Sequence, residues 1–215
     1  MQRPQKYRYY LAILVSLITF VVYLSSLHHE FLEWDDAQYV VENLHIRSIN
    51  IAFIKWAFAD FHAGNWHPVT WISHAIDYAI WGLNPLGHHL TNIILHAVNT
   101  FVVVLLIINL LNVLKETTIK KRPSEFLHER MILIAGGVTG LLFGLHPLHV
   151  ESVAWVAERK DLLCALFVLI SITLYPKYVN SINNELAEEK SSLRFFNKHY
   201  FFILVFFVLA LLSKP

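Results

Sequence analysis

YYLAILVSLITFVVYLSSL, at residues 9–27, contains no charged side chain and follows closely on the basic residues Arg3, Lys6 and Arg8. About 20 predominantly apolar residues cross the hydrocarbon core of a bilayer as one helix. The stretch is longer than the apolar core of a signal peptide, and Leu24 and Leu27 do not fit a small-residue cleavage site. We therefore expect an uncleaved membrane anchor, and this anchor decides the class of fold.

Four further apolar stretches follow along the chain: 90–114, 131–145, 162–176 and 200–213. The first is long enough to span a bilayer, whereas the other three are shorter than a standard span. Their ends carry Arg, Lys or His side chains that can snorkel toward the headgroups. The sequence predicts an all-α, multi-pass transmembrane bundle of about five spans, in a single domain covering residues 1–215.

The composition supports this fold class, because 56% of the 215 residues are hydrophobic, 15% are charged and the mean hydropathy is +0.48. A soluble domain is about 45–50% apolar and about 25% charged. The low charge and the 14% of aromatic residues exclude a disordered chain. The single Cys164 excludes a disulfide scaffold. The net charge of +1 argues against a nucleic-acid partner, since such proteins carry a basic patch.

The charges are distributed unevenly between alternate connecting segments. The N-terminal tail and segments 115–130 and 177–199 hold twelve Lys and Arg residues and have a net charge of +6. Segments 28–89 and 146–161 hold four Lys and Arg against ten Asp and Glu, a net charge of −6. The positive-inside rule then places the N-terminus in the cytoplasm and makes 28–89 and 146–161 the outside loops.

Two segments of the first outside loop, 50–62 and 68–81, show the spacing of amphipathic helices, which lie in the plane of the membrane interface. The first has an apolar stripe of Ile51, Ile54, Phe58 and Phe61. The second has a polar face of Thr70, His74 and Asp77, which we expect to be solvated. All six tryptophans lie in the outside loops, where they form either an aromatic belt or a platform for a sugar or lipid headgroup.

Both outside loops contain residues suited to chemistry. Asp35 and Asp36 directly follow the first span and form either a solvated turn or a base and cation site at the membrane face. The second loop contains His146, His149 and Glu151 but no zinc-protease motif. A hard cation would prefer the oxygens of Asp35 and Glu151, which leaves the histidines to bond a phosphate or to serve as capping and interface residues.

Two spans carry residue patterns that are typical of helix packing. His89, Asn92, His96 and Asn99 share one face of the second span. Polar groups at membrane depth face other helices as hydrogen-bonding contacts, or they line a substrate channel. Gly136, Gly140 and Gly144 form two overlapping GxxxG steps on the third span. We interpret this glycine ridge as a close-packing surface against another helix.

Several long stretches, taken in order, resemble the membrane region of the transmembrane and tetratricopeptide repeat-containing proteins of the C-type glycosyltransferase superfamily. They are EWDDAQYVVENLHIRSIN, FHAGNWHPVTWISHAIDYAIWGLNPLGHHLTNIILHAVNT, FGLHPLHVESVAWVAERKDLLCALF and LSKP. The resemblance extends from about residue 7 to residue 215. It implies an inverting enzyme that moves a sugar, mannose in the animal members, from a polyprenyl-phosphate carrier to a Ser or Thr hydroxyl on the non-cytoplasmic face.

The resemblance also implies roles for individual residues. The acidic motif of the first outside loop falls on Asp35 and Asp36, with the leading Asp as the catalytic base. The motif of the second loop, which helps to hold the carrier phosphate, often with a divalent cation, falls on His146, His149 and Glu151. From their charge or hydrogen-bonding capacity, Arg159, His67 and His89 are further candidate phosphate ligands. A Mg²⁺ or Mn²⁺ ion held by Asp35 and Glu151 is the expected cofactor.

The chain departs from the family pattern in two ways, because it has no 34-residue tetratricopeptide period and offers five spans where about seven are implied. We expect a fragment or truncated form of such an enzyme, with membrane lipid, the lipid-linked sugar and a protein acceptor as partners. The expected location is the bacterial inner membrane, or the endoplasmic reticulum membrane of a eukaryote. The alternatives are an intramembrane metal or haem protein that uses the histidines, and a non-catalytic anchor or assembly subunit.

Overall fold

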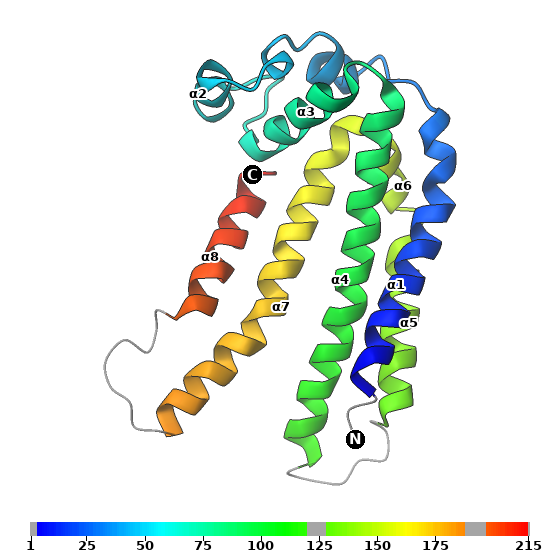
Figure 1. Cartoon of the computed structure of the whole chain (residues 1–215), viewed down its shortest axis with the longest axis vertical. Helices are drawn as coiled ribbons and strands as arrows, with labels where there is room; N and C mark the ends of the chain where they lie inside the picture. The colour runs from blue at the N-terminus through cyan, green and yellow to red at the C-terminus, as the bar shows by residue number, and fades with distance from the viewer. Residues whose placement is uncertain (1–3, 120–127, 188–196, 215) are drawn as a thin grey trace.

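The computed structural model describes residues 4–119, 128–187 and 197–214, and within them it is built from helices, without a named strand. Five long helices form one bundle (Figure 1). They are α1 (Pro4–Val22), α4 (Pro85–Ile119), α5 (Glu129–Leu145), α7 (Arg159–Ala187) and α8 (Lys198–Leu211). The predicted all-α class is confirmed. The basic segments 115–130 and 177–199 and the terminal LSKP fall partly outside the described residues.

The shorter elements gather at one end of the bundle, in what we call the loop layer, residues 29–84 and 146–158 (Figure 1). The layer contains η2 (Ala37–Val41), η3 (His45–Arg47), α2 (Ile51–Ala59), α3 (Pro68–Trp81), α6 (His149–Ala154) and η5 (Val156–Glu158). The short helix η1 (Tyr23–His28) leads into it from α1. The N-terminus lies at the opposite end, so the two predicted outside loops share one end of the bundle. Which side of a membrane this end faces remains a prediction.

Among the described residues, three segments are long and apolar enough to cross a bilayer: Lys6–His28, Pro85–Lys115 and Val156–Asn183. The protein is therefore an integral membrane protein. The predicted spans 131–145 and 200–213 are also helical, but α5 has 17 residues and α8 has 14. Five helices thus occupy the five predicted positions, while a count of five spans remains a prediction.

The glycine ridge packs α5 against α4 and α1, as its spacing predicts. A Cβ added at Gly136 would lie 2.6 Å from Cγ1 of Ile108, and one at Gly140 would overlap the side chain of Val104. A Cβ at Gly144 would overlap the hydroxyl of Thr19. Small residues let helix backbones approach closely in a membrane, where lipid supplies no hydrophobic drive for helix association.

The polar face of α4 is fully buried and bonds the bundle together. Asn99 donates to the carbonyl of Leu162 at 2.9 Å, and His96 hydrogen-bonds to the carbonyl of Gly144 at 3.0 Å. Asn92 donates to the carbonyl of Trp155 at 3.1 Å. Of the two interpretations of this face, interhelical hydrogen bonding is the one that these contacts support.

The two helices of the first loop form where the spacing predicts, but their buried faces differ from the prediction. In α2 the predicted stripe is exposed, whereas Phe53, Trp56 and Ala57 are buried. In α3 the polar face is buried rather than solvated, with Thr70, His74 and Asp77 at most 4% exposed. The reason is that α3 packs against the ends of the long helices, where Thr70 donates to the carbonyl of Ser213 and Asp77 pairs with Arg159.

Candidate functional site

Asp36 ties the first loop to the second. Its Oδ2 accepts the backbone N–H of Leu32 at 3.0 Å, and its Oδ1 accepts that of Ala157, 121 residues further along the chain, at 2.7 Å. The side chain is fully buried. Burial raises the pKa of Asp36 above its usual value, and the two amide donors oppose this rise. Asp36 therefore holds the acidic turn against η5.

Asp35, in contrast, is only partly buried and lies beside a charged group of residues from both loops. Burial raises the pKa of the Tyr39 phenol, and the carboxylates of Asp35 and Glu158 raise it further. Lys160 Nζ lies 2.7 Å from Oε1 of Glu158 and 5.2 Å from the centroid of the Tyr39 ring. We call Asp35, Tyr39, Glu158 and Lys160 the charged cluster.

Arg159, next to Lys160, is fully buried and all of its guanidinium nitrogens are engaged. Nη2 lies 2.6 Å from Oδ2 of Asp77 and donates to the carbonyl of His88 at 2.8 Å. Nε donates to Oδ1 of Asn92 at 2.8 Å, and Nη1 donates to Oγ of Ser73 at 3.3 Å. Arg159 therefore joins α3, α4 and α7. Breaking such a buried pair leaves an uncompensated charge, which makes it a strong structural contact.

Two buried histidines lie between these groups. In the part of the chain that the structure describes, both ring nitrogens of His74 and Nε2 of His67 lack a hydrogen-bond partner. Burial, with the nearby charge of Lys160, lowers the pKa of His67 to about 3. Burial, with the nearby charge of Arg159, holds the pKa of His74 well below its usual value. Both imidazoles are therefore neutral at physiological pH.

The histidines of the second loop lie elsewhere in the layer. The ring centroid of His149 is 5.4 Å from that of His96 and 4.7 Å from that of Phe143. His146 is exposed, and its Nδ1 accepts the N–H of Leu148 at 3.2 Å. Among the described residues, no hydrogen bond, ion pair or ring contact joins either histidine, or the exposed Glu151, to Asp35. The described contacts therefore do not bring together the two groups that the sequence predicts as one site.

Comparison with known proteins finds relatives whose names describe them as protein O-mannosyl-transferases. No family model and no solved structure matches it. Protein O-mannosyl-transferase Tmtc1 of Drosophila melanogaster is 30% identical over 172 residues, and human Protein O-mannosyl-transferase TMTC4 is 30% identical over 189 residues. These alignments cover 76% and 83% of the chain, but 18% and 24% of the relatives.

The chain is a homologue of the TMTC protein O-mannosyl-transferases. Human Protein O-mannosyl-transferase TMTC2 is a third such relative, 27% identical over 182 residues. The chain spans about a quarter or less of the length of these TMTC proteins. The family resemblance inferred from the acidic and histidine-containing motifs is confirmed.

The described residues do not provide an evident metal site, because no group of three or more His, Cys, Asp or Glu side chains among them is arranged to hold a metal ion. Asp35 and Glu151, the two predicted ligands, come from different loops, and no described contact links them. We therefore derive no chemical step through a cation, and the predicted Mg²⁺ or Mn²⁺ remains to be tested by chelation.

The remaining phosphate-ligand predictions, His67 and His89, are both buried and have different ring contacts. His67 contacts Tyr39, with ring centroids 5.3 Å apart, and His89 faces His29 at 6.1 Å. Sequence reasoning missed Lys160 and the partner of Arg159, Asp77. The motif ERKDLL contained the signal for Lys160, because it places a second basic residue directly after Arg159.

Proposed function

We propose that the chain belongs to a membrane glycosyltransferase that moves a sugar from a polyprenyl-phosphate carrier to a hydroxyl of a protein acceptor on the non-cytoplasmic face. The homology to TMTC O-mannosyl-transferases supports this class of reaction. The observation that supports the location of this site is the hydrogen bond that the Ala157 N–H donates to Asp36. It places the acidic turn of one loop beside the basic segment of the other.

In this mechanism Asp35 is the general base. Its carboxylate takes the proton of the acceptor hydroxyl as that oxygen attacks the anomeric carbon of the sugar. The bond between the anomeric carbon and the phosphate oxygen breaks, so polyprenyl phosphate leaves with the bonding electron pair and the configuration inverts. Asp36 is a positioning residue, because both of its oxygens already accept backbone donors.

Lys160 is better placed than Arg159 to neutralise the departing phosphate. All three nitrogens of the Arg159 guanidinium are already engaged. The Lys160 ammonium has three donors, and its described hydrogen bond goes to Glu158 alone. A fixed cation beside developing phosphate charge lowers the barrier. The imidazoles of His67 and His89 would add hydrogen bonds to phosphate oxygens, while His146 and His149 would contact the carrier nearer α5.

The test is transfer from a panel of radiolabelled polyprenyl-phosphate sugars to a Ser- and Thr-containing peptide, in membranes that hold the full-length protein. We expect Asp35→Asn to lower the rate about a hundredfold or more, the usual contribution of a general base. Glu33→Gln, an exposed carboxyl two residues away, is the matched control and should keep the wild-type rate. Wild-type transfer by correctly inserted Asp35→Asn protein would refute the proposal. Running the assay with chelator tests the cation.

The two alternative functions make different predictions. A haem or metal protein should show an absorption band or bound metal after purification, whereas we expect neither to be needed for transfer. If the protein is a non-catalytic anchor, Asp35→Asn should leave every phenotype unchanged.

A further inference from the structure

The loop layer contains an open hollow of about 480 Å³ that the proposed mechanism does not use. The hollow lies between α2 and the chain around η3, and its size falls within the range of small-ligand sites, about 300–1,000 Å³. Its lining includes Leu44, His45, Phe53, Lys55, Trp56 and Asp60.

The floor of the hollow is apolar and rigid. Phe53 and Trp56 are buried members of the layer's hydrophobic core, at 3% and 8% exposure. The imidazole of His45 stacks on the Trp56 indole, with ring centroids 4.4 Å apart and an interplanar angle of 6°. Because His45 covers one face of this indole and His62 meets it edge-on at 5.4 Å, a pyranose ring finds no open tryptophan face here.

The rim of the hollow carries one charge of each sign. Lys55 and Asp60 are both exposed, and neither makes an ion pair within the described ranges 4–119, 128–187 and 197–214. A phosphate would meet the carboxylate of Asp60 as well as the ammonium of Lys55. A polypeptide backbone suits both groups, because each residue offers an N–H donor and a carbonyl acceptor.

The hollow and the candidate base are built on the same packed unit. The Trp56 ring lies 5.5 Å from that of Trp71, which lies 4.8 Å from that of Tyr39 in the charged cluster. His62 also hydrogen-bonds the carbonyl of Gln38, in the turn that follows Asp36, at 3.0 Å. A ligand held in the hollow would therefore be fixed relative to Asp35.

We propose that this hollow binds an extended segment of the polypeptide acceptor, with an apolar side chain against Phe53 and Leu44 and the backbone bonded to Lys55 and Asp60. This inference rests on the proposed function, because it assigns the acceptor subsite of the same transferase.

The probe is a fluorescent synthetic peptide of alternating Thr and Val, titrated with the full-length protein in nanodiscs while fluorescence polarisation is recorded. Ala52→Trp fills the hollow from an exposed lining position, and Asp60→Lys removes the acceptor on its rim. We expect each variant to weaken peptide binding at least about tenfold, which corresponds to about 1.4 kcal/mol. Glu42→Gln, an exposed carboxyl that does not line the hollow, is the control and should bind as the wild type does.

Three results would overturn the inference: no binding of the peptide to the wild type, wild-type affinity in Ala52→Trp, or displacement of the peptide by methyl mannoside, which would indicate a saccharide site. Thermal unfolding of each variant confirms that it is folded. The two proposals fail separately, because Asp35→Asn should abolish transfer yet keep peptide binding. Normal transfer by Asp35→Asn, combined with weakened peptide binding in Ala52→Trp, would refute the mechanism and leave the hollow as a peptide site.

Discussion

Asp35 and Asp36 show how two adjacent, identical residues acquire different roles from their environments. Asp36 is fully buried and accepts two backbone donors, whereas Asp35 is partly exposed and free to meet a substrate. The residues alone predict a functional carboxylate at this turn without distinguishing the two, and only the family resemblance implies that the leading Asp35 is the base. The distinction depends on the Ala157 N–H, which is remote in sequence and is brought close only by the fold.

The burial of His67 in the loop layer should make the free energy of unfolding depend on pH. Its pKa falls from 6.5 to about 3 on folding. Between these two pH values the imidazole is therefore protonated in the unfolded chain and neutral in the folded chain. The stability from this residue is fully present above about pH 6.5 and is lost as the pH falls toward 3. The expected loss is about 1.4 kcal/mol per pH unit for one histidine.

Unfolding in detergent, followed from pH 7 to pH 4, measures this effect. His67→Phe preserves an aromatic ring beside Tyr39 and Trp71 and should reduce the pH dependence by the share of one histidine, while the share of His74 remains. His128→Gln removes an exposed imidazole at the opposite end of the bundle and is the control for that change. A pH dependence that His67→Phe leaves unaltered would contradict the assignment.

The buried pair of Arg159 and Asp77 gives a second prediction at the residue scale. Arg159→Met should destabilise the protein by about 3–5 kcal/mol, because Asp77 then remains buried without its cation. Adding Asp77→Leu should recover much of this loss, since replacing both charges by apolar groups is often nearly neutral. Denaturant unfolding of the single and double variants measures the coupling, with the exposed Arg47→Met as control. Additive losses would show that the two side chains do not depend on each other.

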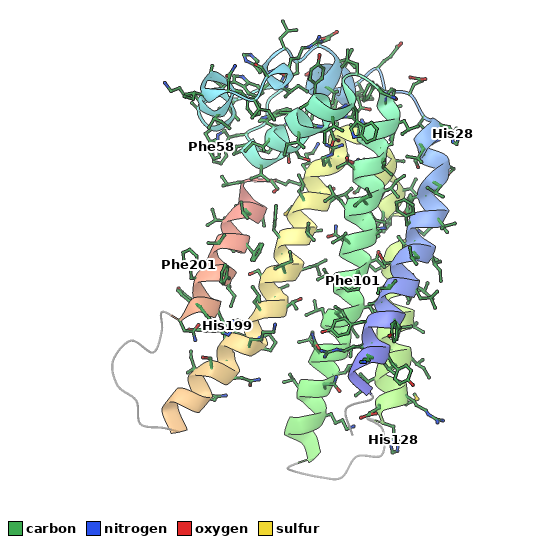
Figure 2. All side chains as sticks on the ribbon, in the orientation of Figure 1. His28, Phe58, Phe101, His128, His199 and Phe201 are labelled. Carbon is green, nitrogen blue, oxygen red and sulfur yellow. The ribbon has the colours of Figure 1, made fainter. Side chains whose placement is uncertain are left out.

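At the scale of single elements, periodicity predicts where helices form better than it predicts which face they bury. The stripe of α2 is exposed because this helix is apolar on nearly every side, and the larger Trp56 occupies the core instead. Phe58 lies on the side of the loop layer nearest the bundle (Figure 2), which suits contact with a membrane surface. Likewise α7 continues through Pro176 to Ala187. The helix therefore extends beyond the apolar stretch 162–176 that predicts it.

The glycine ridge of α5 supplies a prediction at the same scale. Gly140→Ala should lower stability by about 1–3 kcal/mol, because the added methyl group overpacks against Val104. Val104→Ala in the same chain should relieve the overlap, so the double variant should be more stable than the sum of the two single effects predicts. Thermal unfolding in detergent is the measurement. Val138→Ala, on the exposed face of α5, should have little effect.

For the whole molecule, the alternation of apolar and charged segments predicts that residues 28–89 and 146–161 share one end, and the fold agrees. The contacts within that end could not be predicted, because Arg159 meets Asp77 and Asn92 only after three helices have packed. The contacts of His149 could not be predicted either, because it meets His96 and Phe143 only where α6 packs beside α4 and α5.

The charge distribution predicts the orientation of the whole molecule, with the −6 loops outside and the +6 segments inside. Cysteine labelling tests this in a Cys164→Ser background, which removes the only native thiol. Ser48→Cys, exposed in the loop layer, should react with a membrane-impermeant maleimide in intact cells. Glu129→Cys, exposed at the opposite end of the bundle where α5 begins, should react only after permeabilisation. The positive-inside rule requires this order, because the basic segments resist translocation across the membrane. The reverse labelling order would place Asp35 in the cytoplasm and would remove the topological support for a transferase that works on the other face.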